Sequence, residues 1–209
     1  MTRGVSKGLS KEIILTAAFE IVETGGVEAL SMRRLGTALG VAAMAIYNHF
    51  PDREHLLDAM AECAMSAIAI EDHKSNWKKQ IKSIARSVAK LSIDRPAVFA
   101  LCMSRPQKPR AAIALMSRVL EAMRSGGLSE REALICYHSV LILLHGFPFW
   151  HSGLIANCSV TPNATSHPGL TAQEIKDWQL IHKVDAGKQL EASLDLLLEG
   201  IFASSSKKK

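Results

Sequence analysis

The sequence lacks the features that mark exported and membrane-embedded proteins. Its first twelve residues, MTRGVSKGLSKE, contain no apolar stretch of the kind found in a secretory signal peptide. The longest apolar run, Ala133 to Trp150, is interrupted by two histidines, a glycine and a proline. We expect this run to be too short and too polar to span a bilayer and to form a buried or interface helix. These absences favour a cytoplasmic protein with no membrane partner.

The sequence also lacks the signatures of common catalytic and metal sites. The four cysteines are far apart and show no CxxC spacing, so we expect reduced and mostly packed thiols. The sequence has no glycine-rich phosphate loop and no recognisable catalytic set of nucleophile, base and acid. We therefore predict no catalytic residues, no metal site and no cofactor.

Strand patterns are missing as well, and helical patterns replace them. Residues that favour strands never alternate with polar ones over a useful length, whereas apolar residues recur at helical spacing along most of the chain. Capping boxes at Ser129–Glu132 and Thr171–Glu174 mark two helix starts. Loops are expected at 71–76, 106–109 and 151–170. The 209 residues are enough for one large domain or two small ones, and the predicted class is all-α.

Charge is unevenly distributed along the chain. The net charge is +5, but residues 1–60 contain six basic and seven acidic side chains, so global basicity does not support nucleic-acid binding in that part. A basic stripe recurs every fourth residue on one expected helix, at Lys78, Lys82, Arg86 and Lys90. The stripe is interpreted either as a solvated face or as a surface that attracts an anionic ligand or DNA.

The stretch from Ser31 to Arg53 reads as two short helices joined by a tight turn. Ser31 is a favourable N-cap, and Gly40 supplies the backbone freedom that a sharp turn between helices needs. Helical periodicity divides residues 42–50 into an inner side with Ala42, Ile46 and Phe50 and an outer side with Met44, Tyr47 and Asn48. A short helix that exposes small, aromatic and amide side chains suits the major groove of DNA.

This segment resembles the helix-turn-helix of TetR family transcriptional regulators. The resemblance covers roughly residues 9–65, through LSKEIILTAAFEIVETGGVEALSMRRLGTALGV, IYNHF and PDREHLLDAM. It implies an N-terminal three-helix DNA-binding domain over 1–53, with its motif at about 31–50, joined to the rest through a helix from about 52. Residues 54–209 are then an effector-binding and dimerisation domain. The implied function is that of a homodimeric repressor, released from a palindromic double-stranded DNA operator by a small-molecule effector.

The same resemblance implies a set of DNA contacts. The matching positions are Arg33, Ala43, Met44, Ala45, Tyr47, His49 and Arg53, and Asn48 joins them as a polar side chain on the outer face. Arg53 and Tyr47 match phosphate contacts, and His49 matches a second backbone contact. The alanines offer no side-chain hydrogen bonds, so either few polar contacts and DNA shape carry specificity, or affinity for any one site is modest. Tyr47 and His49 could alternatively pack against the first helix.

The C-terminal part offers weaker candidates for an effector pocket. They are Phe99, Met103, Tyr137, His138, Leu141, His145, Phe149 and Trp150. His138 and His145 are seven residues apart and share a helix face, either as ligand-binding groups or as core or interface histidines. Two other functions stay open at this point, an enzyme that uses one of these histidines and a helical interaction module with an incidental helix-turn-helix.

Overall fold

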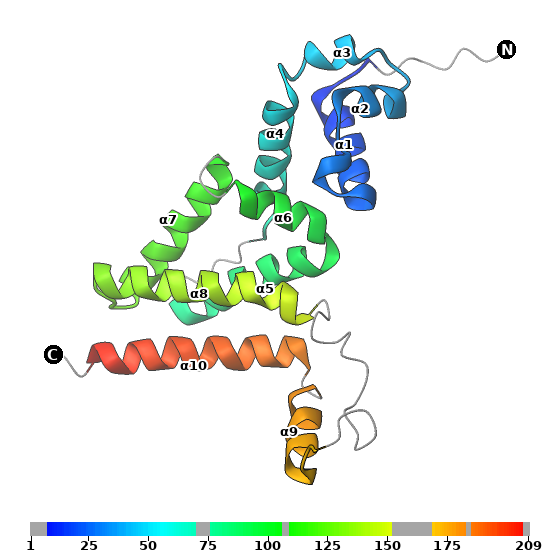
Figure 1. Cartoon of the computed structure of the whole chain (residues 1–209). Coiled ribbons are helices and arrows are strands. Elements are labelled where there is room, and N and C mark those ends of the chain that lie inside the picture. The colour runs from blue at the N-terminus through cyan, green and yellow to red at the C-terminus, as the bar shows by residue number, and fades with distance from the viewer. Residues whose placement is uncertain (1–7, 70–75, 106–108, 152–168, 183–184, 207–209) are drawn as a thin grey trace. The chain divides into compact units, whose positions relative to one another are not determined.

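The computed structural model describes residues 8–69, 76–105, 109–151, 169–182 and 185–206, and every secondary-structure element in these ranges is a helix (Figure 1). The prediction of an all-α fold is therefore confirmed. The elements are α1 (Lys11–Gly25), η1 (Val27–Ala29), α2 (Met32–Leu39), α3 (Ala43–Tyr47), α4 (Arg53–Ser66), α5 (Trp77–Asp94), α6 (Pro96–Ser104), α7 (Arg110–Ser125), α8 (Glu130–His151), α9 (Ala172–His182) and α10 (Ala186–Ser206). The loops expected at 71–76, 106–109 and 151–170 lie largely outside the described residues.

Local capping groups set most of the helix boundaries. The Ser31 hydroxyl accepts a hydrogen bond from Arg34 N at 3.1 Å, and the Asp52 carboxylate accepts one from His55 N at 2.8 Å. Both predicted capping boxes form; at the second, Thr171 N donates to Glu174 at 2.7 Å and Glu174 N donates to Thr171 Oγ1 at 3.2 Å. Each bond satisfies an amide that a helix start would otherwise leave without a partner. Helix starts were therefore readable from sequence.

The chain divides into two compact units. The first contains residues up to Ile68 together with 94–116, and the second contains 69–93 together with 117–209. In the first unit α6 packs against α1 and α4, so a helix distant in sequence belongs to the same unit as the helix-turn-helix. The predicted division into a DNA-binding domain (1–53) and an effector domain (54–209) concerns function and stays a prediction. The first compact unit is larger than the predicted DNA-binding domain, because it also contains the residues up to Ile68 and 94–116.

The core of the first unit is a set of apolar side chains with no solvent contact or almost none. Apolar residues of α4 and of the turn that follows it are buried. They are Leu56, Leu57, Met60, Ala64 and Ile68. Residues from α1, α2, α3 and α6 complete the core, namely Ile14, Ala18, Leu35, Ile46, Val98 and Leu101. This core holds the helix-turn-helix through hydrophobic burial.

In the second unit α8 packs along α10 (Figure 1). The segment Glu130–Phe149 is long and apolar enough to cross a membrane by length and composition, which corrects the expectation that it is too short and too polar. Packing within the protein also explains the apolar composition of α8. Its buried residues recur at helical spacing and are Ala133, Cys136, Val140 and Leu144. Length and composition alone are weak evidence for a membrane span.

The basic stripe of α5 is paired with carboxylates on α10. Lys78 Nζ lies 2.7 Å from Glu199, and Lys82 Nζ lies 2.8 Å from Asp195 and 3.1 Å from Glu191. Arg86 also pairs with Glu191. The interpretation of the stripe as a solvated face is therefore wrong for Lys78 and Lys82, which are half-buried, whereas Arg86 is exposed as that interpretation predicts. We call this set the α5–α10 ladder; it joins two helices more than a hundred residues apart in sequence.

Candidate nucleic-acid interface

The turn between α2 and α3 determines how the exposed helix leaves the core. Gly40 ends α2 in the left-handed conformation with φ 66°, as its position in the sequence predicts. Four residues earlier, a Cβ atom at Gly36 would lie 2.8 Å from the Val41 carbonyl oxygen and 3.2 Å from Ala43 N. Gly36 therefore allows the backbone that enters α3 to approach α2 closely. Sequence reasoning missed this role, although an isolated glycine inside a helical pattern is a signal of close packing.

The two sides of α3 differ sharply in exposure. Ile46 is completely buried and Phe50 is 4% exposed, whereas Met44 is 71% and Tyr47 43% exposed. Ala42 corrects the prediction of an inner position, because it is exposed and serves as the N-cap residue outside the helix. A buried anchor therefore holds a short helix whose opposite side presents a thioether and a phenol to solvent.

The remaining predicted contacts surround this exposed side. Asn48 is exposed, while Ala43, Ala45 and His49 are half-buried. Arg33, on α2, is exposed and lines a hollow of about 680 Å³ together with Ser31, Arg34, Thr37 and Ala38. The hollow runs along α2 from its N-cap to its last turn, and the two arginines in its lining favour an anion. The described structure thus places the predicted residues of α2 and α3 in one unit.

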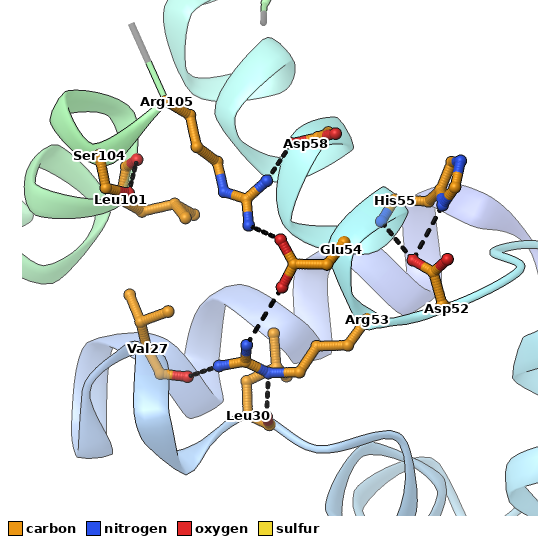
Figure 2. Close-up of polar contacts among 10 residues, drawn as sticks. All are labelled: Val27, Leu30, Asp52, Arg53, Glu54, His55, Asp58, Leu101, Ser104 and Arg105. Atoms are coloured by element: carbon orange, nitrogen blue, oxygen red, sulfur yellow. Dashed lines mark hydrogen bonds and ion pairs between the residues drawn. The ribbon is translucent and has the colours of Figure 1, made fainter.

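Arg53 differs from the other predicted contacts, because its guanidinium group is engaged within the protein. Figure 2 shows its bonds: Nε donates to the Leu30 carbonyl at 2.8 Å and Nη2 donates to the Val27 carbonyl at 2.8 Å. The third nitrogen, Nη1, lies 3.5 Å from a carboxylate oxygen of Glu54. Arg53 therefore links the start of α4 to η1 and to the residue that precedes the N-cap of α2.

Glu54 also accepts a hydrogen bond from a second arginine, Arg105, which follows the end of α6. Arg105 donates to Glu54 and to Asp58 of α4 (Figure 2), and its side chain is only 11% exposed. Desolvation lowers the pKa of Arg105, but the hydrogen bonds to Glu54 and Asp58 outweigh it, so this pKa stays above its ordinary value. We call Arg53, Glu54, Asp58 and Arg105 the α4 charge cluster. No sequence signal identified it, because Arg105 lies 51 residues from Glu54 in the sequence.

The candidate effector residues are divided between the two units. Phe99 is buried and Met103 half-buried on α6 in the first unit. In the second unit Tyr137 and Leu141 are half-buried, and desolvation raises the pKa of the Tyr137 phenol. His138, His145 and Phe149 are exposed, and the side chain of Trp150 lies outside the described part. The predicted role of these eight residues in a single pocket stays a prediction.

A smaller cavity lies between α8 and α10. It has a volume of about 360 Å³ and is lined by Ile142, Leu143, Gly146, Phe147, Gln189, Leu190 and Ser193. Among the residues that the structure describes, no group of three histidine, cysteine, aspartate or glutamate side chains could hold a metal ion.

Comparison with known proteins agrees with this geometry. The family model described as bacterial regulatory proteins, tetR family, matches residues 14–60. The HTH-type transcriptional repressor DrrR1 of Streptomyces coeruleorubidus is 28% identical over 148 residues, which cover 70% of this chain and 53% of DrrR1. The chain thus spans about half the length of this and similar curated relatives.

Two solved structures share the fold. Apo ActR from Streptomyces coelicolor has a TM-score of 0.79 at 21% identity, covering 98% of this chain and 100% of that one. ActR has also been solved with (S)-DNPA and with actinorhodin. BioQ of Mycobacterium smegmatis has a TM-score of 0.69 at 20% identity, covering 94% and 99%, and has also been solved with its natural double-stranded DNA operator. Residues 14–60 thus match the tetR family of bacterial regulatory proteins, and the described structure shares the fold of ActR and BioQ.

Proposed function

We propose that the chain is a homodimeric transcriptional repressor that binds a palindromic operator and leaves it when a small molecule binds. The observation that carries this proposal is the exposed side of α3. Met44 and Tyr47 project from a helix that Ile46 and Phe50 anchor in the core, and Arg33 lies on the preceding helix. Such a helix can enter a major groove while basic side chains contact phosphates. A repressor of this kind works in the cytoplasm, where its operator lies.

The proposed contacts divide into two chemical classes. Met44, Ala43 and Ala45 would supply apolar contacts to thymine methyl groups, and Asn48 is the amide that could pair with adenine. Tyr47, His49 and Arg33 would contact the phosphate backbone, which sets register and carries no sequence information. Few polar groups would then touch base edges, so we propose that DNA shape contributes to specificity.

Selection from a randomised duplex pool tests this proposal. The full-length chain should enrich a palindromic sequence, and its affinity should fall as salt concentration rises. Tyr47→Ala and Met44→Ala should weaken binding to the enriched duplex. Ile113→Ala is the matched control, because Ile113 is an exposed apolar side chain on α7. Failure to enrich any sequence, or equal affinity of all three variants, would contradict the proposal.

An exposed apolar face on α8 and α10 supports the dimer. Ile135, Ile142 and Phe149 recur every seven residues on α8 and are all exposed, and Leu196 on α10 is 77% exposed. Contiguous apolar side chains on a protein surface often mark an association site, and two recognition helices are needed to read a palindrome. His138 and His145 follow the same seven-residue spacing, so we propose that they belong to this face as interface histidines.

A charge placed on this face tests the dimer. Leu196→Glu should convert the dimer to a monomer in sedimentation equilibrium and should abolish cooperative binding to the palindrome. Leu180→Glu is the matched control, because Leu180 is an exposed leucine on α9. A monomeric wild-type chain, or a Leu196→Glu variant that stays dimeric, would contradict the assignment.

The effector is the least defined part of the proposal. ActR, a structural relative at 21% identity, has been solved with two small molecules. By analogy we propose that the second unit of this chain responds to a small molecule, whose identity native mass spectrometry of the purified chain would reveal. A bound compound that releases the selected duplex supports the proposal, and one that leaves DNA affinity unchanged counts against it.

A further inference from the structure

We propose that Arg53 is a positioning residue for DNA binding and does not contact phosphate. Through Arg53 and Glu54, the α4 charge cluster holds the entry of α2 against the start of α4. The inference rests on the proposed DNA-binding function. It departs from the phosphate contact that the sequence resemblance implies for this position.

The first observation is the way the guanidinium group of Arg53 is used. Two nitrogens on one edge of its planar fork donate to the carbonyls of Val27 and Leu30, each at 2.8 Å. Val27 is the first residue of η1, and its carbonyl also accepts a hydrogen bond from Leu30 N at 3.2 Å, whereas Leu30 is the C-cap residue that follows η1. Leu30 is buried and is followed directly by Ser31, the N-cap of α2. Arg53 therefore constrains the backbone from which the helix-turn-helix begins.

The second observation is charge balance. The third nitrogen of Arg53 faces Glu54, whose other oxygen accepts from Arg105, and Arg105 also pairs with Asp58. The α4 charge cluster thus contains two arginines and two carboxylates and has no net charge. A phosphate would have to compete with two carbonyls and a carboxylate for Arg53. An exposed arginine such as Arg33, whose guanidinium has no hydrogen bond or ion pair among the described residues, suits that task better.

The third observation is the position of the cluster at a junction. Arg53 and Glu54 lie in the first turn of α4, and Arg105 is the C-cap residue of α6. Hydrogen bonds in the cluster therefore connect the end of α6, the start of α4 and the entry of α2 within one compact unit. Loss of the Arg53 fork would leave the angle between α2 and α4 less constrained, and α3 would present its exposed side to DNA with less precision.

The test measures affinity against salt, with the duplex that the wild-type chain enriches from the randomised pool as probe. Removal of a phosphate contact lowers the slope of log K against log [salt] by about 0.9 for each contact. For Arg53→Gln we expect about tenfold weaker binding, the order of a lost charged hydrogen bond, with an unchanged slope. Arg53→Lys keeps the charge but cannot donate along a planar fork, so we expect it to bind as weakly as Arg53→Gln.

Glu54→Gln separates the two roles by the sign of its effect. If Arg53 contacts phosphate, removing a neighbouring negative charge should strengthen DNA binding. If Arg53 is a positioning residue, the neutral amide weakens the cluster and binding should become weaker. Glu54 is largely exposed, so this variant avoids the folding risk of a core substitution. Arg118→Gln on α7 is the control for loss of one exposed positive charge and should bind like wild type.

The outcomes are distinguishable at a temperature where circular dichroism shows every variant folded. A lower slope for Arg53→Gln, wild-type affinity for Arg53→Lys together with weaker binding by Arg53→Gln, or stronger binding by Glu54→Gln would each establish a phosphate contact and overturn the positioning role. Wild-type affinity in all three variants, with only a lower melting temperature, would reduce Arg53 to a stabilising residue. If the wild-type chain itself enriches no duplex, the proposed function fails and this inference fails with it.

Discussion

Substitution of Gly36 by alanine tests how closely α2 and α3 must pack. The added Cβ atom would lie 2.8 Å from the Val41 carbonyl oxygen and 3.2 Å from Ala43 N. Both neighbours are backbone atoms of the turn that enters α3, and Val41 N already donates to the Gly36 carbonyl at 2.9 Å. They cannot rotate away as a flexible side chain would. The turn must therefore shift, and the start of α3 must shift with it.

Two opposing effects determine the size of the change. Alanine favours a helix over glycine by about 1 kcal/mol, whereas overpacking against rigid neighbours costs about 1–3 kcal/mol. We expect the overpacking to dominate, because the closest contact is with backbone, and the free energy of unfolding to fall by about 1 kcal/mol. For a chain of 209 residues this corresponds to a melting temperature lower by about 2–4 °C.

Thermal denaturation followed by circular dichroism measures this effect, with Gly200→Ala as the matched control. Gly200 also lies inside a helix, but a Cβ atom there would meet nothing within 4 Å. The control should therefore gain up to about 1 kcal/mol from helix propensity alone. A Gly36→Ala variant that is as stable as the control, and that binds the selected duplex like wild type, would refute the reasoning about close approach.

Two further predictions concern charge and thiol chemistry. Hydrogen bonds from Arg86 and Lys82 lower the pKa of Glu191 below its ordinary 4.5, so the stability it contributes is present above pH 4.5 and is lost as the pH falls through the lowered pKa. In urea denaturation Glu191→Gln should cost up to about 1 kcal/mol near neutral pH and nothing in strong acid; an equal cost at both pH values would contradict the α5–α10 ladder. Burial raises the pKa of Cys102 and of Cys136 to about 11, while Cys63 is exposed. Iodoacetamide at about pH 7 should therefore modify Cys63 before Cys102 and Cys136, as peptide mass mapping would report, and equally fast modification of Cys136 would count against its burial.

The helices and their caps were predictable because the signals are local. Ser31 and the two capping boxes bond to amides three residues away, as the sequence predicted, and the buried apolar residues of α4 recur at helical spacing. The same periodicity identified the buried Ile46 and the exposed Met44. It failed at Ala42, because the helix begins one residue later and the N-cap does not follow helical spacing.

The hydrogen-bond partners of the lysine and arginine side chains were predicted less well. The basic stripe of α5 has an obvious spacing, but its carboxylate partners lie on α10, more than a hundred residues away. Likewise nothing near Arg53 in the sequence indicates the Val27 and Leu30 carbonyls, which are 26 and 23 residues distant. A single sequence carries no information about such pairs until the fold brings them together.

The sequence by itself thus determined an all-α chain, a helix-turn-helix at about 31–50 and the outward side of its second helix. These features depend on hydrogen bonds and hydrophobic periodicity within one or two helical turns. Only the tertiary structure decided that α6 packs with the helix-turn-helix, that Gly36 lets α3 approach α2, and that Arg53 is held by backbone carbonyls. Each of these depends on contacts between segments separated in the chain, whose geometry is set by how helices pack and not by local preference.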